Sequence, residues 1–168
     1  MPNLVMTIIG PDKPGIVEAF AEQVATHGGN WLESRMAHLG GQFAGILHLS
    51  VAAGQVDELM AGLRSVEGMQ VHLQPANAAA AASLPGLRTA TLDLVGHDRP
   101  GIVRAISHVL AEYGVNVEEL ETTVESAPMA ADLLFKATAT LGLPDGVSVD
   151  DLREALETIA SDLMVTVE

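Results

Sequence analysis

The chain has 168 residues, and its 8 Lys and Arg against 22 Asp and Glu give a formal charge of −14. A surface this negative repels phosphate backbones, so the composition argues against direct binding to DNA or RNA. The absence of cysteine excludes disulfides, thiolate metal sites and cysteine nucleophiles, and it is compatible with the reducing cytosol.

The sequence predicts neither a membrane span nor a signal peptide. No stretch approaches the roughly 18 uninterrupted apolar residues of a membrane-spanning helix. Residues 1–10 lack a basic beginning, and their apolar run is too short for a signal peptide. We therefore expect a cytoplasmic protein with no membrane partner.

An internal repeat organises the chain. The segment Gly10-Pro-Asp-Lys-Pro-Gly-Ile-Val17 recurs as Gly96-His-Asp-Arg-Pro-Gly-Ile-Val103, and 11 of 27 positions aligned from these two glycines are identical. Self-similarity at a fixed offset is the signature of a duplicated structural unit. The sequence therefore predicts two copies of one fold.

Each copy shows the same order of elements. In the first, residues 4–9 are rich in branched apolar side chains, as in a strand. The stripe Ile16, Phe20 and Val24 predicts a helix that ends at Gly28. Strands over 31–38 and 43–52 follow, joined by a Gly-Gly hairpin, then an amphipathic helix over 56–66 and a strand over 69–73.

The second copy repeats this order, with strands over 89–95, 117–125 and 132–140, a helix after Gly101, a helix over 149–159 and a strand over 163–167. The fold class is therefore α+β, with two ferredoxin-like βαββαβ domains in tandem. We expect domains at 1–75 and 88–168, joined by an uncharged Ala/Pro linker at 76–87. One face of each sheet needs a cover, so we expect the domains to pack as a pseudo-dimer.

The Asp-x-Pro-Gly-Ile-Val turns and the Gly-x-Asn lead-ins Gly28-Gly29-Asn30 and Gly114-Val115-Asn116 resemble those of the ACT domain. The tandem arrangement more narrowly resembles the glycine cleavage system transcriptional repressor family, on the segments 28–36, 41–45 and 96–103. This resemblance implies a ligand site formed by the turn of one domain and the Asn-bearing strand of its partner domain. It also implies indirect control of transcription through a DNA-binding activator, in agreement with the negative charge.

The turns carry the candidate binding chemistry. Proline fixes φ, glycine allows close approach, and the helix N-terminus beyond them offers unpaired N–H groups to a carboxylate. Asp side chains could accept from a ligand ammonium group, and Asn amides both donate and accept. These groups together suit a free amino acid. The candidate ligand-binding residues are Asp12, Pro14, Gly15, Ile16, Asn30, His97, Asp98, Pro100, Gly101, Ile102 and Asn116.

A purely structural role for these residues stays open, because Asp-x-Pro-Gly is also good capping chemistry and Gly-x-Asn good helix-stop chemistry. The repeat does not decide between the two roles, since a duplicated fold repeats its caps as well. Nor does the sequence rank the two turns. His97 is the one histidine expected in the site; the six histidines show no metal-ligand spacing.

No nucleophile elbow, phosphate-binding loop or metal set is present, so we expect no enzyme activity and no cofactor. The sequence predicts a non-catalytic regulator that senses a small amino acid, with glycine a candidate, where the two ACT domains meet. Its expected partner is a transcriptional regulator protein. The alternative is a ligand-free ACT module for protein–protein interaction or oligomerisation; a homodimer and a monomer both stay open.

Overall fold

The computed structural model describes residues 1–77 and 86–168, which form two compact units, Met1–Ala82 and Ser83–Glu168. Each unit is described by itself. The predicted linker at 76–87 lies mostly outside the described residues. The domain boundaries and the pseudo-dimer therefore stay predictions.

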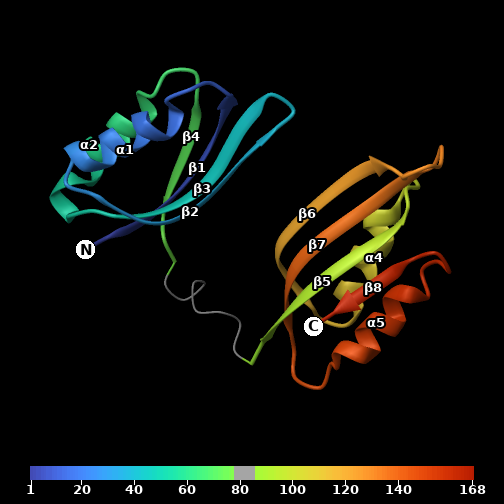
Figure 1. Ribbon diagram of the computed structural model, residues 1–168. Helices are drawn as coiled ribbons and strands as arrows, with labels where there is room; N and C mark the ends of the chain where they lie inside the picture. The colour runs from blue at the N-terminus through green and yellow to red at the C-terminus, as the bar shows by residue number, and fades with distance from the viewer. Residues whose placement is uncertain (78–85) are drawn as a thin grey trace. The chain divides into compact units, whose positions relative to one another are not determined.

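The first unit is a four-stranded antiparallel sheet with two main helices (Figure 1). Its strands lie in the order β2-β3-β1-β4. The elements are β1 (Asn3–Pro11), α1 (Ile16–Thr26), β2 (Asn30–Leu39), β3 (Gln42–Ser50), the 3-10 helix η1 (Ala53–Gln55), α2 (Val56–Arg64) and β4 (Gln70–Pro75).

Alternation along β1 explains how this sheet forms. Leu4, Met6 and Ile8 are buried, whereas the residues between them are at least partly exposed. Since side chains of a strand point alternately to its two faces, one face of β1 belongs to the core. Phe20 of α1 and Leu59 of α2 are fully buried in the same core, so both helices cover this face.

The second unit repeats the first, with strands in the order β6-β7-β5-β8 (Figure 1). The predicted βαββαβ order is thereby confirmed in both units. The elements are β5 (Arg88–His97), α4 (Ile102–Glu112), β6 (Asn116–Ser126), β7 (Leu133–Leu143), α5 (Val149–Glu157) and β8 (Met164–Val167).

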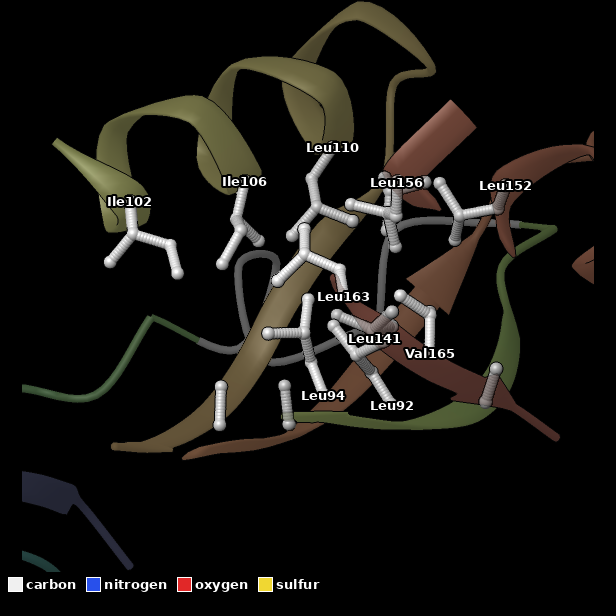
Figure 2. Close-up of a cluster of buried hydrophobic side chains, with 14 of the residues drawn as sticks. Leu92, Leu94, Ile102, Ile106, Leu110, Leu141, Leu152, Leu156, Leu163 and Val165 are labelled. Carbon is white, nitrogen blue, oxygen red and sulfur yellow. The ribbon is translucent and has the colours of Figure 1, made fainter. Parts of the chain in front are cut away.

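The core of the second unit lies between its helices and one face of its sheet. Figure 2 shows Ile106 and Leu110 pointing from α4 toward Leu94 and Leu92 of the sheet. Leu156 of α5 completes this layer and is fully buried. The helical stripes predicted from the sequence are therefore the core-facing stripes of α4 and α5.

Several element ends differ from the predictions. The last helices of the two units end at Arg64 and Glu157, so Val66 and Ile159 pack against the cores from the following loops. Strand β7 continues to Leu143 instead of ending at 140, because its ladder with β5 extends to Arg88. The Gly-Gly hairpin between β2 and β3 is confirmed, with positive φ at both glycines (58° and 80°).

No helix among the described residues is long and apolar enough to cross a membrane.

Candidate functional site

Both strand-to-helix turns end in a glycine with left-handed backbone. Gly15 (φ 89°) and Gly101 (φ 81°) are the N-cap residues of α1 and α4, and no side chain caps either helix. A Cβ built on either glycine has no described neighbour within 4 Å. Glycine is therefore favoured at these positions by the left-handed backbone and not by lack of space. The first N–H groups of each helix, which follow the glycine, lack intrahelical partners.

The prolines of the two turns lie two positions before the first residue of each helix. Pro14 and Pro100 precede the N-cap glycines, and the helices begin at Ile16 and Ile102. The prolines therefore restrict the chain before the helix, outside its first turn. The isoleucine side chains are buried in the cores (4% and 5% exposed), so they offer a ligand no side chain. The backbone N–H of Ile102 already donates to the carbonyl of Arg99 (3.3 Å).

Asp12 contacts the hairpin rather than the helix. Its carboxylate lies 2.5 Å from Nδ1 of His38, and its backbone N–H donates to the carbonyl of Gly41 (3.0 Å). The capping role that the sequence left open for this carboxylate is therefore absent, since no side chain caps α1. The sequence analysis missed His38, because only the β2–β3 hairpin brings it to a turn 26 residues away.

In the second unit, the carboxylate of Asp162, which lies outside the turn, bonds two residues of the turn, His97 and Arg99. The Asp162 carboxylate accepts from the backbone N–H of His97 (2.7 Å) and from Nη1 of Arg99 (3.2 Å). These two donors, the backbone N–H first, lower the pKa of Asp162 to about 2. Nδ1 of His97 lies 3.0 Å from the same carboxylate, and Asp98 donates its backbone N–H to the carbonyl of Leu133 (2.9 Å).

A cavity of about 330 Å³ opens beside the first turn, where the beginning of α1 meets the end of α2. Three predicted site residues line it, Pro14, Gly15 and Ile16. The other lining residues were not predicted from the sequence: Lys13, Ala19, Glu22, Gln23, Ser65, Val66 and Glu67. Lys13 lies inside the repeated turn, whereas Ser65, Val66 and Glu67 lie about 50 positions away, so no local motif could have indicated these three.

The lining of this cavity includes charged groups of both signs. The N-terminus of α1 is the positive end of a helix dipole, and Lys13 adds a cation beside it. The cavity also borders the C-terminus of α2, which is the negative end of its dipole, and Glu67 adds a carboxylate there. This arrangement suits a small molecule that carries both an anionic and a cationic group.

One position makes the two turns different. The register of β4 against β1 and of β8 against β5 relates Gly68 of the first unit to Asp162 of the second. The sequence repeat relates Lys13 to Arg99. In the first unit there is no side chain at this position, and the hydrogen bond of Lys13 Nζ goes to a backbone carbonyl, that of Glu67, at 3.4 Å. Among the described residues, the ammonium group of the first turn therefore has no carboxylate partner, whereas the guanidinium group of the second pairs with Asp162.

The two asparagines do not join the turns within their own units. Asn30 pairs with Ser50, which also pairs with Asn3, so Asn30 lies at the end of the sheet where β1 begins. The turn follows the other end of β1. Asn116 occupies the equivalent position in the second unit, opposite Gly142. Both asparagines are exposed. Their predicted part in a ligand site stays a prediction.

A repeated βαββαβ fold with a polar cavity at the first strand-to-helix turn defines a tandem ferredoxin-like protein. The model of the ACT domain matches residues 3–74 and 89–168, and the chain belongs to this family. The family and the fold expected from the two Asp-x-Pro-Gly turns are thereby confirmed.

Relatives extend over the whole chain. The glycine cleavage system transcriptional repressor of Escherichia coli (strain K12) is 25% identical over 166 residues, covering 95% of this chain and 85% of that protein. A crystal structure of an unknown protein from Galdieria sulphuraria is 30% identical with a TM-score of 0.86, covering 99% of this chain and 97% of that one. A structure proposed to be a glycine cleavage system transcriptional repressor shares the fold (17% identity, TM-score 0.70, covering 99% and 96%).

Proposed function

We propose that this protein is a non-catalytic regulator that binds a small amino acid, with glycine a candidate, and controls transcription indirectly through a protein partner. The observation that carries the proposal is the cavity at the first turn, whose lining includes one cationic residue, Lys13, and two acidic residues, Glu22 and Glu67. A zwitterionic amino acid needs donors for its carboxylate and acceptors for its ammonium group, and Lys13 and Glu67 supply one of each.

The size and charge of the molecule support this function. A volume of about 330 Å³ lies at the lower end of the roughly 300–1,000 Å³ of small-molecule sites, so the cavity suits a small ligand. Glycine is suggested by the printed name of the Escherichia coli relative. The charge of −14 disfavours contact with DNA, so control of transcription requires a protein partner. The lack of cysteine supports a cytoplasmic location.

In the part of the chain that is described, no three His, Asp or Glu side chains are arranged to hold a metal ion. Binding alone can still regulate, provided that the amino acid binds one state of the protein better than another. Such coupling is reciprocal, so the partner must change the affinity for the amino acid by the same factor.

Calorimetry with glycine, alanine, serine and leucine tests the proposal. We expect wild type to bind one of them and Lys13→Gln to bind it at least tenfold more weakly, because the variant loses the cation at the carboxylate end. Arg104→Gln is the matched control, since it removes an exposed cation of α4 outside the cavity. This control is expected to bind like wild type.

Two results would contradict the proposal in different ways. If wild type binds none of the amino acids, the alternative of a ligand-free ACT module is favoured. If Lys13→Gln binds as tightly as wild type, the amino acid is bound elsewhere and the cavity is not the site.

A further inference from the structure

Gln23 brings an unpaired amide to the lining of the cavity at the first turn. It lies on α1, roughly two helical turns beyond Gly15, and its side chain is partly buried. A side-chain amide can both donate and accept hydrogen bonds, yet among the described residues this one makes none. A partly buried polar group without a partner is unfavourable, so a ligand that bonds this amide gains affinity.

Gly62 of α2 provides the space in which this amide lies. A Cβ built on Gly62 would collide with Oε1 of Gln23 and would come within 2.8 Å of Cε1 of His27. The amide therefore occupies the volume that a side chain of residue 62 would fill, where α1 and α2 lie against each other (Figure 1). Glycine is unfavourable inside a helix, so its presence at this contact is consistent with a need for space.

The second unit has neither of these two residues. The sequence repeat places Val109 at the position of Gln23. Helices α2 and α5 both have nine residues and begin with valine, which relates Gly62 to Ala155. Val109 packs against the core of its unit. The fold therefore accepts an apolar pair between its two helices, and packing alone does not explain the amide and the glycine of the first unit.

We infer that Gln23 selects the ligand: the cavity prefers an amino acid with a neutral, hydrogen-bonding side chain, such as serine, threonine or asparagine. Lys13 and Glu67 would bind the charged groups that all amino acids share, and the Gln23 amide would bond the hydroxyl or amide of the side chain. Glycine and alanine leave this amide without a partner, and leucine would bury it unpaired. This inference rests on the proposed function and narrows its ligand.

Calorimetry on the full chain with matched amino acids tests the inference. Asparagine and leucine have nearly the same size, and serine differs from alanine by one oxygen atom. We expect asparagine to bind at least tenfold more tightly than leucine, and serine about fivefold more tightly than alanine, because a site with an unpaired amide rejects a ligand that cannot bond it. Aspartate and lysine are expected to bind more weakly than asparagine, since neither side chain both donates and accepts.

Removal of the amide separates its role from that of the charged residues. Gln23→Met keeps the size of the side chain, and we expect it to weaken asparagine about tenfold and to leave leucine within twofold of wild type. Gln55→Met is the matched control, because Gln55 belongs to η1 and is not among the residues that line the cavity. Lys13→Gln is expected to weaken both amino acids, since it acts on the carboxylate that they share.

A second variant displaces the amide without removing it. In Gly62→Ala the new Cβ takes the space of Oε1 of Gln23, so the amide must move. We expect the preference for asparagine over leucine to fall at least threefold. Alanine is a better helix former than glycine, and thermal unfolding is expected to show that the variant remains folded. Gly54→Ala is the control, because a Cβ there has no described neighbour within 4 Å.

The failure of this inference is distinguishable from the failure of the proposed function. If wild type binds amino acids but does not prefer asparagine to leucine, or if Gln23→Met keeps that preference, Gln23 does not select the ligand and amino-acid sensing stands. Tighter binding of aspartate or lysine than of asparagine would also overturn the inference, because the charged residues would then determine the choice. If wild type binds none of these amino acids, the proposed function fails and the inference fails with it.

Discussion

Arg99 Nη1 lies 3.2 Å from Asp162 Oδ1, and this ion pair separates two turns that are otherwise built alike. In the first unit the corresponding residues are Lys13 and Gly68, and a Cβ built on Gly68 lies 3.8 Å from Nζ of Lys13. A carboxylate at residue 68 would therefore reach this ammonium group. The side chain of Asp162 thus neutralises Arg99 in the second turn, and Gly68 provides no such side chain for Lys13 in the first.

We predict that Gly68→Asp weakens amino-acid binding at least tenfold, because the new carboxylate pairs with Lys13 and repels the carboxylate of the ligand. Gly68 has φ of 81°, so any side chain there adds backbone strain. Gly68→Asn is the matched control, since it has nearly the same size and strain without the charge. Calorimetry on both variants measures the effect, and equal affinities would contradict it.

The pKa of Asp162 predicts a pH dependence of stability. Its folded-state pKa of about 2 lies below the ordinary 3.8, so the unfolded chain binds the proton more tightly. The stabilisation from this carboxylate is fully present above about pH 5 and is lost as the pH falls through 3.8 toward 2. We expect Asp162→Asn to be less stable than wild type at pH 7, with a difference that shrinks between pH 4 and pH 2.

Urea unfolding at a series of pH values measures this difference. Glu157→Gln is the control for the loss of an acidic side chain, because Glu157 is exposed on α5 and has no ion pair in the described residues. A difference between wild type and Asp162→Asn that stays constant down to pH 2 would contradict the assignment.

The left-handed N-cap of α1 predicts the cost of Gly15→Ala. Space is available at this position, so the cost comes from the positive φ alone and should be about 1 kcal/mol in the free energy of unfolding. Gly54 is the matched control: a Cβ there is also unobstructed, but its φ is not in the left-handed region. We expect Gly54→Ala to be neutral or slightly stabilising in the same denaturation experiment. Equal losses at the two positions would mean that backbone strain is not the cause.

Two neighbours on β3 test the assignment of the sheet faces. Leu47 is fully buried, whereas Ile46 points to the other face and is 58% exposed. We predict that Leu47→Ala lowers the free energy of unfolding by about 2–5 kcal/mol, because it leaves a cavity in the core. Ile46→Ala is expected to cost less than about 1 kcal/mol. Chemical denaturation measures both, and the reverse order would place the core on the opposite face.

The sequence by itself determined the duplication, the order of elements and the two glycine turns. These features are local: alternation in β1, the 3.6-residue stripe of α1, and glycines where the backbone must turn. The element ends were predicted less well, since β7 extends as far as its partner β5 allows.

The tertiary structure alone decided the chemistry around the turns. The pairing of Asp12 with His38 depends on the β2–β3 hairpin, and the pairing of Arg99 with Asp162 depends on how β8 follows α5. The cavity requires the beginning of α1 and the end of α2 to meet. Contacts between residues far apart in the chain leave no periodicity in the sequence. Only the folded arrangement therefore distinguishes the first turn, where Lys13 borders the cavity, from the second, where Asp162 pairs with Arg99.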